Sequence, residues 1–308
     1  MSAVVNAILP VFALILAGYI GRRSGCLGKT AASELNRAVV WLFLPALLFT
    51  TTATAKLEEI WHPGFIIVVV LSTLLVFAAT VIYRMRAGQR LADASVDGLC
   101  TSYANTGYVG IPLCILVLGD AGIQPAIIAT LNVVFVLFAI AVVCIEIDLQ
   151  TEQTLGKAVI KVLRSLAMNP LIVSPIVGAA WAVSGLPIPA PALQFLDMLG
   201  TATIPCALAS LGAFLAHKHS GSTQGATGLV LIKLIVHPLI AWVLAFHVFH
   251  LPPFWANAAL LLSALPTGTG PYMLAELYGR EGSVSSQVTL VSTLGSLVTL
   301  SICLYLIG

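Results

Sequence analysis

The sequence predicts an all-α membrane protein with ten transmembrane helices, and three observations support this prediction. Of its 308 residues, 59% are hydrophobic and 8% are charged, against roughly 25% charged residues in a soluble domain. Ten apolar stretches are each long enough to cross about 30 Å of hydrocarbon. None alternates as a barrel strand does, so each should satisfy its own backbone as a helix. With a net charge of +2, the composition excludes a soluble enzyme, a disordered chain and a nucleic-acid binder.

The spans follow one another along the whole chain. The first has no basic segment before its apolar run, so it is expected to be a retained helix and not a cleaved signal peptide. The six cysteines form no CxxC pair and read as small buried hydrophobes, so neither a metal nor a cofactor is expected. The predicted spans lie near 3–21, 35–55, 64–83, 95–118, 123–146, 167–184, 193–216, 227–249, 254–278 and 284–307.

Basic residues fix the expected orientation. Twelve of the fourteen Lys and Arg residues follow odd-numbered spans, whereas Lys56 alone follows an even-numbered one and Lys233 lies inside span eight. The positive-inside rule places the side with twelve basic residues in the cytoplasm. Ten spans then leave both termini on the non-cytoplasmic side of the cytoplasmic (inner) membrane.

The chain contains an internal repeat. A shift of 160 residues superimposes seven glycines or prolines of one half on those of the other, including Pro45 on Pro205 and Gly110 on Gly270. We expect a first five-helix repeat at 1–146, a cytoplasmic linker at 147–166 and a second repeat at 167–308. Because five is odd, the second repeat enters the membrane from the opposite face, which is typical of secondary transporters. Duplication without a transport role remains an alternative.

Spans four and nine are expected to be broken and to cross. Both carry Gly, Pro and polar residues halfway along an apolar stretch, at 102–119 and 260–279. Glycine and proline are unfavourable inside helices, and unwound backbone at this depth is tolerated only in a cavity or within protein. Two half-helix N-termini facing one cavity would bind an anion, most naturally a carboxylate. Pro-kinked packing helices are the alternative. The candidate substrate-binding residues are Asn105, Thr106, Gly107, Pro266, Thr267, Gly268 and Thr269, with Asn105 and Thr267 as the main side-chain donors.

These residues carry a resemblance to a known family. The chain resembles the auxin efflux carrier family, which includes bacterial members and the plant PIN carriers, over essentially its whole length. The resemblance rests on the sequences at 35–36, 44–49, 105–107, 110–113, 169–171, 265–268 and 275–279, together with Lys233, Pro238 and Pro271.

The resemblance implies a fold of two inverted five-helix repeats, related to bile-acid-type sodium symporters. Spans four and nine would cross at the site, spans one, two, six and seven would form a scaffold, and the others would move as an elevator. A homodimer through the scaffold helices is a further expectation. Plant members have a proline before the asparagine where this chain has Ala104, so the first break is expected to rest on Gly107 and local polarity. Some bacterial members are assigned malonate or other organic-acid transport.

Three further polar residues are candidates for coupling or support. Lys233 and His237 lie four apart and share a helix face, and Lys233 could alternatively snorkel to the cytoplasmic surface. Glu276 could carry a coupling proton or anchor span nine at the surface. Glu146 is expected to be solvated. No nucleotide-binding or hydrolase motif is present, so an enzyme is not expected.

Together these observations predict a secondary carrier that moves a small organic anion across the membrane by elevator-type alternating access. The alternatives are a sodium-coupled symporter of the bile-acid type and a non-transporting membrane receptor.

Overall fold

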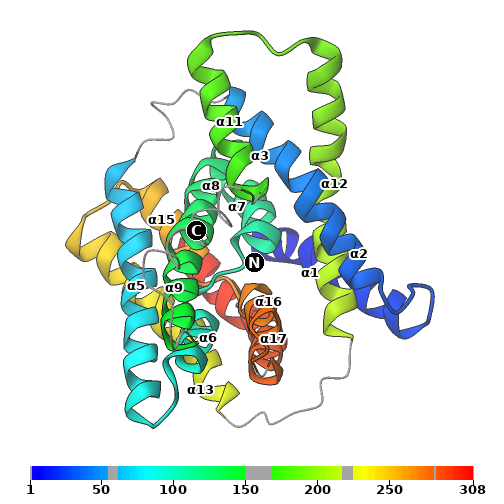
Figure 1. Ribbon diagram of the computed structural model, residues 1–308. Helices are drawn as coiled ribbons and strands as arrows, with labels where there is room; N and C mark the ends of the chain where they lie inside the picture. The colour runs from blue at the N-terminus through cyan, green and yellow to red at the C-terminus, as the bar shows by residue number, and fades with distance from the viewer. Residues whose placement is uncertain are drawn as a thin grey trace. The chain divides into compact units, whose positions relative to one another are not determined.

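The fold is helical throughout the part of the chain that the computed structural model describes, which is residues 2–54, 62–149, 168, 170–216, 225–280 and 282–307. One isolated β-bridge is the exception among these residues. The helices in Figure 1 group into two compact units. Unit 1 comprises Met1–Val4, His62–Arg164 and His219–Gly308, and unit 2 comprises Val5–Trp61 and Ser165–Lys218. Each unit therefore draws on both halves of the sequence.

Unit 2 consists of helices that approach one another closely at small residues. A Cβ atom on Gly212 would lie 1.8 Å from the carbonyl oxygen of Ile15, and one on Gly18 would lie 2.0 Å from that of Ala209. Such contact between backbones is how membrane helices gain packing energy without a hydrophobic driving force. The helices are α1 (Ser2–Arg23), α2 (Ala31–Ala38), η1 (Val39–Phe43), α3 (Leu44–Thr54), α11 (Pro170–Ser184) and α12 (Ala190–Leu215).

Unit 1 contains the two interrupted segments and the helices around them. Its first part comprises α5 (Pro63–Arg86), α6 (Leu91–Ser102), η2 (Thr106–Gly110), α7 (Ile111–Leu118), η3 (Asp120–Gly122), α8 (Ile123–Leu131), η4 (Asn132–Leu137) and α9 (Phe138–Leu149). Its second part comprises α13 (Ala226–Leu231), η5 (Ile232–Val236), α14 (His237–Trp242), η6 (Val243–Val248), α15 (Pro253–Ser263), α16 (Gly270–Leu277) and α17 (Ser283–Ile307).

Six of the expected spans are confirmed as helices long and apolar enough to cross a membrane. Within the described residues they are Ala31–Thr54, Pro63–Arg86, Asp120–Leu149, Ala190–Leu215, Ala226–Val248 and Ser283–Ile307. The protein is therefore a multi-pass membrane protein. The first expected span is helical as α1, the sixth corresponds to the shorter α11, and spans four and nine are each divided into two helices. A total of ten crossings stays a prediction.

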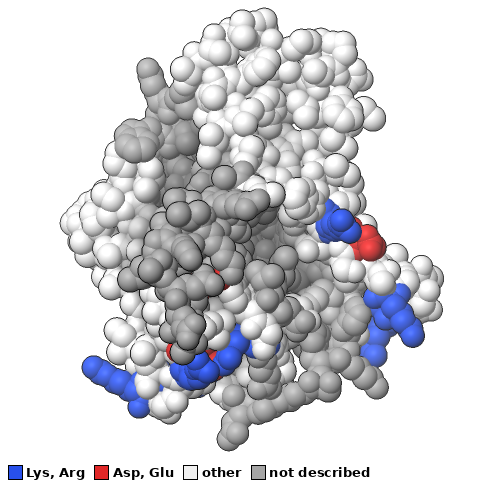
Figure 2. All heavy atoms as spheres, viewed as in Figure 1, with Lys and Arg blue, Asp and Glu red and all other residues white. Residues whose placement is uncertain are grey.

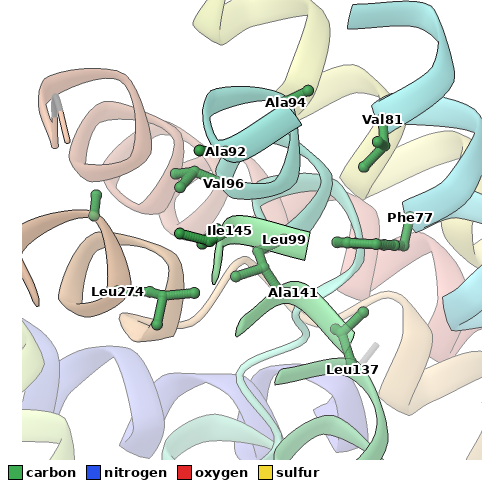
Figure 3. Close-up of a cluster of buried hydrophobic side chains, with 11 residues drawn as sticks. Phe77, Val81, Ala92, Ala94, Val96, Leu99, Leu137, Ala141, Ile145 and Leu274 are labelled. Atoms are coloured by element: carbon green, nitrogen blue, oxygen red, sulfur yellow. The ribbon is translucent and has the colours of Figure 1, made fainter. Parts of the chain in front are cut away.

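A buried apolar cluster holds the first half of span four and the second half of span nine in one core. Figure 3 shows side chains from α5, α6, η4, α9 and α16 pointing toward one another. Leu99 of α6 and Leu274 of α16 belong to this cluster and are almost fully buried. Because α6 and α16 share this core, the two interrupted segments are fixed to each other at one end.

Charged side chains join the same helices at their ends. Arg84 Nε lies 2.8 Å from Asp97 Oδ2, Arg90 pairs with Asp148 of α9 at 3.1 Å, and Arg280 pairs with Asp93 of α6. The hydrogen bonds to Asp93 raise the pKa of the Arg280 guanidinium further above its ordinary value, so this cation stays charged at every accessible pH. Figure 2 shows Lys and Arg side chains at the lower ends of these unit 1 helices.

Glu146 differs from its expected solvated position. It is only 4% exposed and accepts a hydrogen bond of 2.8 Å from the Tyr278 hydroxyl. The contact brings the end of α9 against the segment that follows α16. Its partner Tyr278 lies 132 residues further along the chain. The local sequence around Glu146 therefore does not reveal this burial.

Candidate functional site

The predicted interruptions of spans four and nine are confirmed. α6 ends at Ser102 and η2 begins at Thr106, which leaves residues 103–105 outside any helix. α15 ends at Ser263 and α16 begins at Gly270, which leaves residues 264–269 non-helical. Both gaps lie between apolar helices, so the backbone groups that they release need partners within the protein.

The two interrupted segments cross and supply those partners to each other. The Asn105 N–H donates to the Pro266 carbonyl at 2.9 Å, and the Gly268 N–H donates to the Tyr103 carbonyl at 3.1 Å. These bonds flank an antiparallel bridge between Ala104 and Thr267. The crossing lies entirely within unit 1. The two non-helical segments therefore pair as neighbouring β-strands do, over a few residues between the helical halves of each span.

The side-chain amide of Asn105 has a hydrogen-bond donor without a partner at this crossing. Its backbone carbonyl accepts from the N–H groups of Val109 and Gly110, at 3.1 and 2.9 Å. Its side chain is 4% exposed, and its Nδ2 atom has no hydrogen-bond partner among the described residues. A buried donor without a partner costs about 1–3 kcal/mol. The amide is therefore available to a ligand with an acceptor oxygen.

The residues that follow Asn105 differ from the expected arrangement. Thr106 is buried and donates its N–H to the Ala104 carbonyl at 2.8 Å. Gly107 lies inside the π-helical segment η2 and not at the break. The break therefore lies before Gly107, among the polar residues around Asn105, and the pairing of Ala104 with Thr267 holds the non-helical backbone before η2 begins.

Both the hydroxyl and the N–H of Thr267 donate hydrogen bonds within unit 1. Its hydroxyl donates to the carbonyl of Cys100 in the last turn of α6 at 2.7 Å, and its N–H donates to Ser292 Oγ at 3.0 Å. The residue is fully buried. Its hydroxyl proton therefore satisfies a helix-end carbonyl, in contrast to the ligand-donor role expected from the sequence. Thr269, two residues on, is partly exposed.

Lys233 and His237 lie together inside unit 1, next to the end of α15. Lys233 Nζ donates to the Ser263 carbonyl at 2.7 Å and lies 3.0 Å from His237 Nδ1. The two residues are 0% and 2% exposed, so the snorkelling alternative for Lys233 is wrong. The Lys233 amine lies where helix-end carbonyls concentrate negative charge. The side chain of Glu276 lies outside the described residues.

A small cavity borders the crossing. Its volume is about 20 Å³, which is room for roughly one water molecule. Its polar lining comes from Ser72, Thr73, Thr106, His237 and Ser263. The cavity is too small for an organic anion in this conformation, but it brings hydroxyl groups of α5 close to the interrupted segments.

Sequence reasoning missed the contribution of α17 to the crossing. Thr289 Oγ1 donates to the Gly268 carbonyl at 3.2 Å, and Ser292 Oγ accepts from Thr267. A signal was present, because Ser285, Thr289, Ser292 and Ser296 recur at helical spacing in the last predicted span. Tyr103 was missed as well, and its ring packs on the glycines of span nine.

Comparison with known proteins shows the family of this chain. The family model described as "Membrane transport protein" matches residues 3–304. The chain belongs to this membrane transport protein family. It is the auxin efflux carrier family that the sequence motifs resemble, and the chain is accordingly a membrane transporter and not an enzyme.

Relatives within this transporter family match over nearly their full lengths. A Rhizobium meliloti protein named "Putative malonate transporter" is 30% identical over 311 residues, covering 100% of this chain and 97% of the relative. An uncharacterized transporter of Methanothermobacter thermautotrophicus is 26% identical, covering 96% of this chain and 95% of the relative. The uncharacterized transporter YfdV of Escherichia coli is 25% identical, with 98% and 96% covered.

Proposed function

We propose that this transporter is a secondary carrier for a small organic anion, whose carboxylate binds where the two interrupted segments of unit 1 cross. The observation that carries the proposal is the Asn105 amide, which is buried at the crossing and has no partner for Nδ2 in the described part of the chain. A carboxylate accepts from such a donor in a charge-assisted hydrogen bond, which is shorter and stronger than a neutral one.

Backbone electrostatics favour the same ligand. The second half of each interrupted segment starts at the crossing, at Thr106 for η2 and α7 and at Gly270 for α16. Helix N-termini carry free N–H groups and about half a positive charge. Lys233 adds a buried amine nearby and forms none of the ion pairs found among the described residues. These groups favour an anion over a neutral or cationic substrate.

Roles for the remaining candidates follow from their contacts. We assign Asn105 and the backbone at Gly107 and Thr269 to the substrate, and Thr106, Pro266, Thr267 and Gly268 to holding the crossing. Lys233 and His237 support the end of α15, because the Lys233 amine bonds to the Ser263 carbonyl and lies against the His237 ring. Glu276 keeps its candidate role in coupling.

Malonate is the first substrate to test. It is a short dicarboxylate, and the Rhizobium meliloti relative, 30% identical to this chain, is named for it. A short dianion also suits a site built from one amide, backbone N–H groups and a nearby amine. We therefore extend the proposal to malonate and to carboxylates of similar size.

The division into two units supports a mechanism of alternating access. Unit 1 contains both interrupted segments, and its apolar cluster and ion pairs tie α5, α6, α9 and α16 together. We propose that unit 1 moves as one elevator-like body and carries the substrate, while unit 2 is the scaffold and the surface through which a homodimer would form. The halves 1–146 and 167–308, joined by 147–166, would be the inverted repeats. Both termini would lie on the non-cytoplasmic side of the cytoplasmic membrane.

A binding experiment tests the carboxylate site. Purified transporter is heated with malonate or with malonamide, its uncharged diamide analogue, and the unfolding temperature is measured. Malonate should stabilise the protein because it binds the native state, and malonamide should not. Asn105→Ala should weaken malonate affinity by at least about 10-fold, which corresponds to about 1.4 kcal/mol and is close to the lower end of the range for a hydrogen bond to a charged group.

Asn132→Ala is the matched control. Asn132 is also a buried asparagine of unit 1, and its Nδ2 donates to Thr73 Oγ1 at 3.3 Å. This variant should keep the malonate effect. Equal malonate affinity in Asn105→Ala and in the unsubstituted protein would refute the site. A sodium-dependent shift would favour the symporter alternative, and binding without flux in proteoliposomes would favour the receptor alternative.

A further inference from the structure

The ring of Tyr103 occupies space at the point where α16 begins. A Cβ atom on Gly270 would lie 2.5 Å from Tyr103 Cζ, and one on Gly268 would lie 2.9 Å from Tyr103 Cε1. Real Cβ atoms do not approach other atoms this closely, because packed interiors leave no such overlap. Because they have no Cβ atom, Gly268 and Gly270 of span nine leave the space that the Tyr103 ring of span four occupies.

This ring is held in place from several sides. The Tyr103 N–H donates to the Leu99 carbonyl at 2.8 Å, and its carbonyl accepts from Gly268 at 3.1 Å. The ring meets Phe138 edge-on, with centroids 6.4 Å apart, and packs against the apolar cluster of unit 1. Displacing the ring would disturb both the backbone pairing at the crossing and this packing. These contacts hold the ring of Tyr103 in one position.

The ring of Tyr103 lies near Asn105, whose Nδ2 atom has no partner among the described residues. Tyr103 precedes Asn105 by two residues, and a Cβ on Gly268 would lie 3.4 Å from the Asn105 Cα atom. Tyr103 is nevertheless partly exposed, whereas Asn105 and Gly268 are buried. The ring of Tyr103 and the Cα atom of Asn105 therefore both border Gly268, just before α16 begins.

We propose that Tyr103 sets the upper size limit of the carboxylate that this transporter accepts. The inference rests on the proposed carboxylate site and specifies its substrate class as short aliphatic acids. A substituent on the carbon between the carboxylates would have to occupy the volume of the ring. Specificity of this kind comes from a clash built against the larger ligand.

Two variants and two ligands test the size limit. Malonate and phenylmalonate differ by one phenyl group, which is close in volume to the ring that Tyr103→Ala removes. The unsubstituted protein should bind phenylmalonate at least about 10-fold more weakly than malonate, by the scale of discrimination that a packed pocket gives. In Tyr103→Ala this ratio should fall about 10-fold or more. Tyr103→Phe keeps the ring and should keep the ratio.

The outcomes separate this inference from the proposed function. An unchanged ratio in Tyr103→Ala, with malonate binding still dependent on Asn105, would overturn the role of Tyr103 and leave the carboxylate site standing. Failure of the unsubstituted protein to bind any short carboxylate would overturn both. If Tyr103→Ala does not yield folded protein, Tyr103→Leu keeps packing volume against Phe138 while removing the ring, and the same shift in ratio is expected.

Discussion

Two side chains at the crossing, Asn105 and Thr267, have different tasks although the sequence suggested the same one. The Asn105 Nδ2 atom has no partner among the described residues, whereas the Thr267 hydroxyl donates to the Cys100 carbonyl. A group that already satisfies the backbone contributes to stability, and a group left without a partner is available to a ligand. Substitution of each residue should therefore affect a different quantity.

Thr267→Val tests this division of tasks. Valine keeps the shape of threonine but leaves the Cys100 carbonyl without its hydroxyl donor, so the protein should lose about 1–3 kcal/mol of stability. Malonate affinity should change less than about twofold in the folded fraction. The unfolding temperature and a malonate titration measure the two quantities. A large loss of affinity with unchanged stability would instead make Thr267 a ligand donor.

Lys233→Met tests the buried amine at the end of α15. Methionine fits much of the same volume but cannot donate to the Ser263 carbonyl, so this variant should lower the free energy of unfolding by about 1–3 kcal/mol. Lys29→Met is the control, because Lys29 is exposed in a loop. Thermal unfolding compares the two. Equal stability of both variants would contradict a supporting role for Lys233.

At the scale of the elements, unit 2 depends on glycines where α1 meets α12. A Cβ on Gly212 would lie 1.8 Å from the Ile15 carbonyl oxygen, so Gly212→Ala should push the two helices apart and destabilise unit 2 by about 1–3 kcal/mol, as overpacking does. A Cβ on Gly228 of α13 would meet no atom within 4 Å. Gly228→Ala should be neutral or stabilising by up to about 1 kcal/mol. Thermal unfolding of both variants checks the contrast, and equal losses would contradict it.

The interruptions of spans four and nine could be predicted from the sequence because their cause is local. Clusters of Gly, Pro and polar residues lower helix stability wherever they occur. The partners at the crossing could not be predicted in the same way. The Thr267 hydroxyl bonds to a carbonyl 167 residues away, and the ring of Tyr103 fits glycines of the other half. Such contacts depend on the three-dimensional register of two segments, which a single sequence does not contain.

At the scale of the whole molecule, the units follow a different division from the predicted repeats. Unit 1 and unit 2 each combine residues from both halves of the chain, and unit 2 contains the spans one, two, six and seven for which the family resemblance implies a scaffold. The sequence alone also predicted a polytopic helical membrane protein, since so few charges cannot cover a soluble surface. The burial of Lys233 could not be predicted, because distance along a helix does not reveal what packs around it.

The proposed transport function depends on a carboxylate binding at the crossing of the two interrupted segments, and a structure determined with malonate bound would locate that carboxylate. We expect a carboxylate oxygen of malonate within about 3 Å of Asn105 Nδ2, the distance of a hydrogen bond, with Thr267 still bonded to Cys100. Malonate bound elsewhere in the protein, with the Asn105 amide still without a partner, would contradict the proposed site.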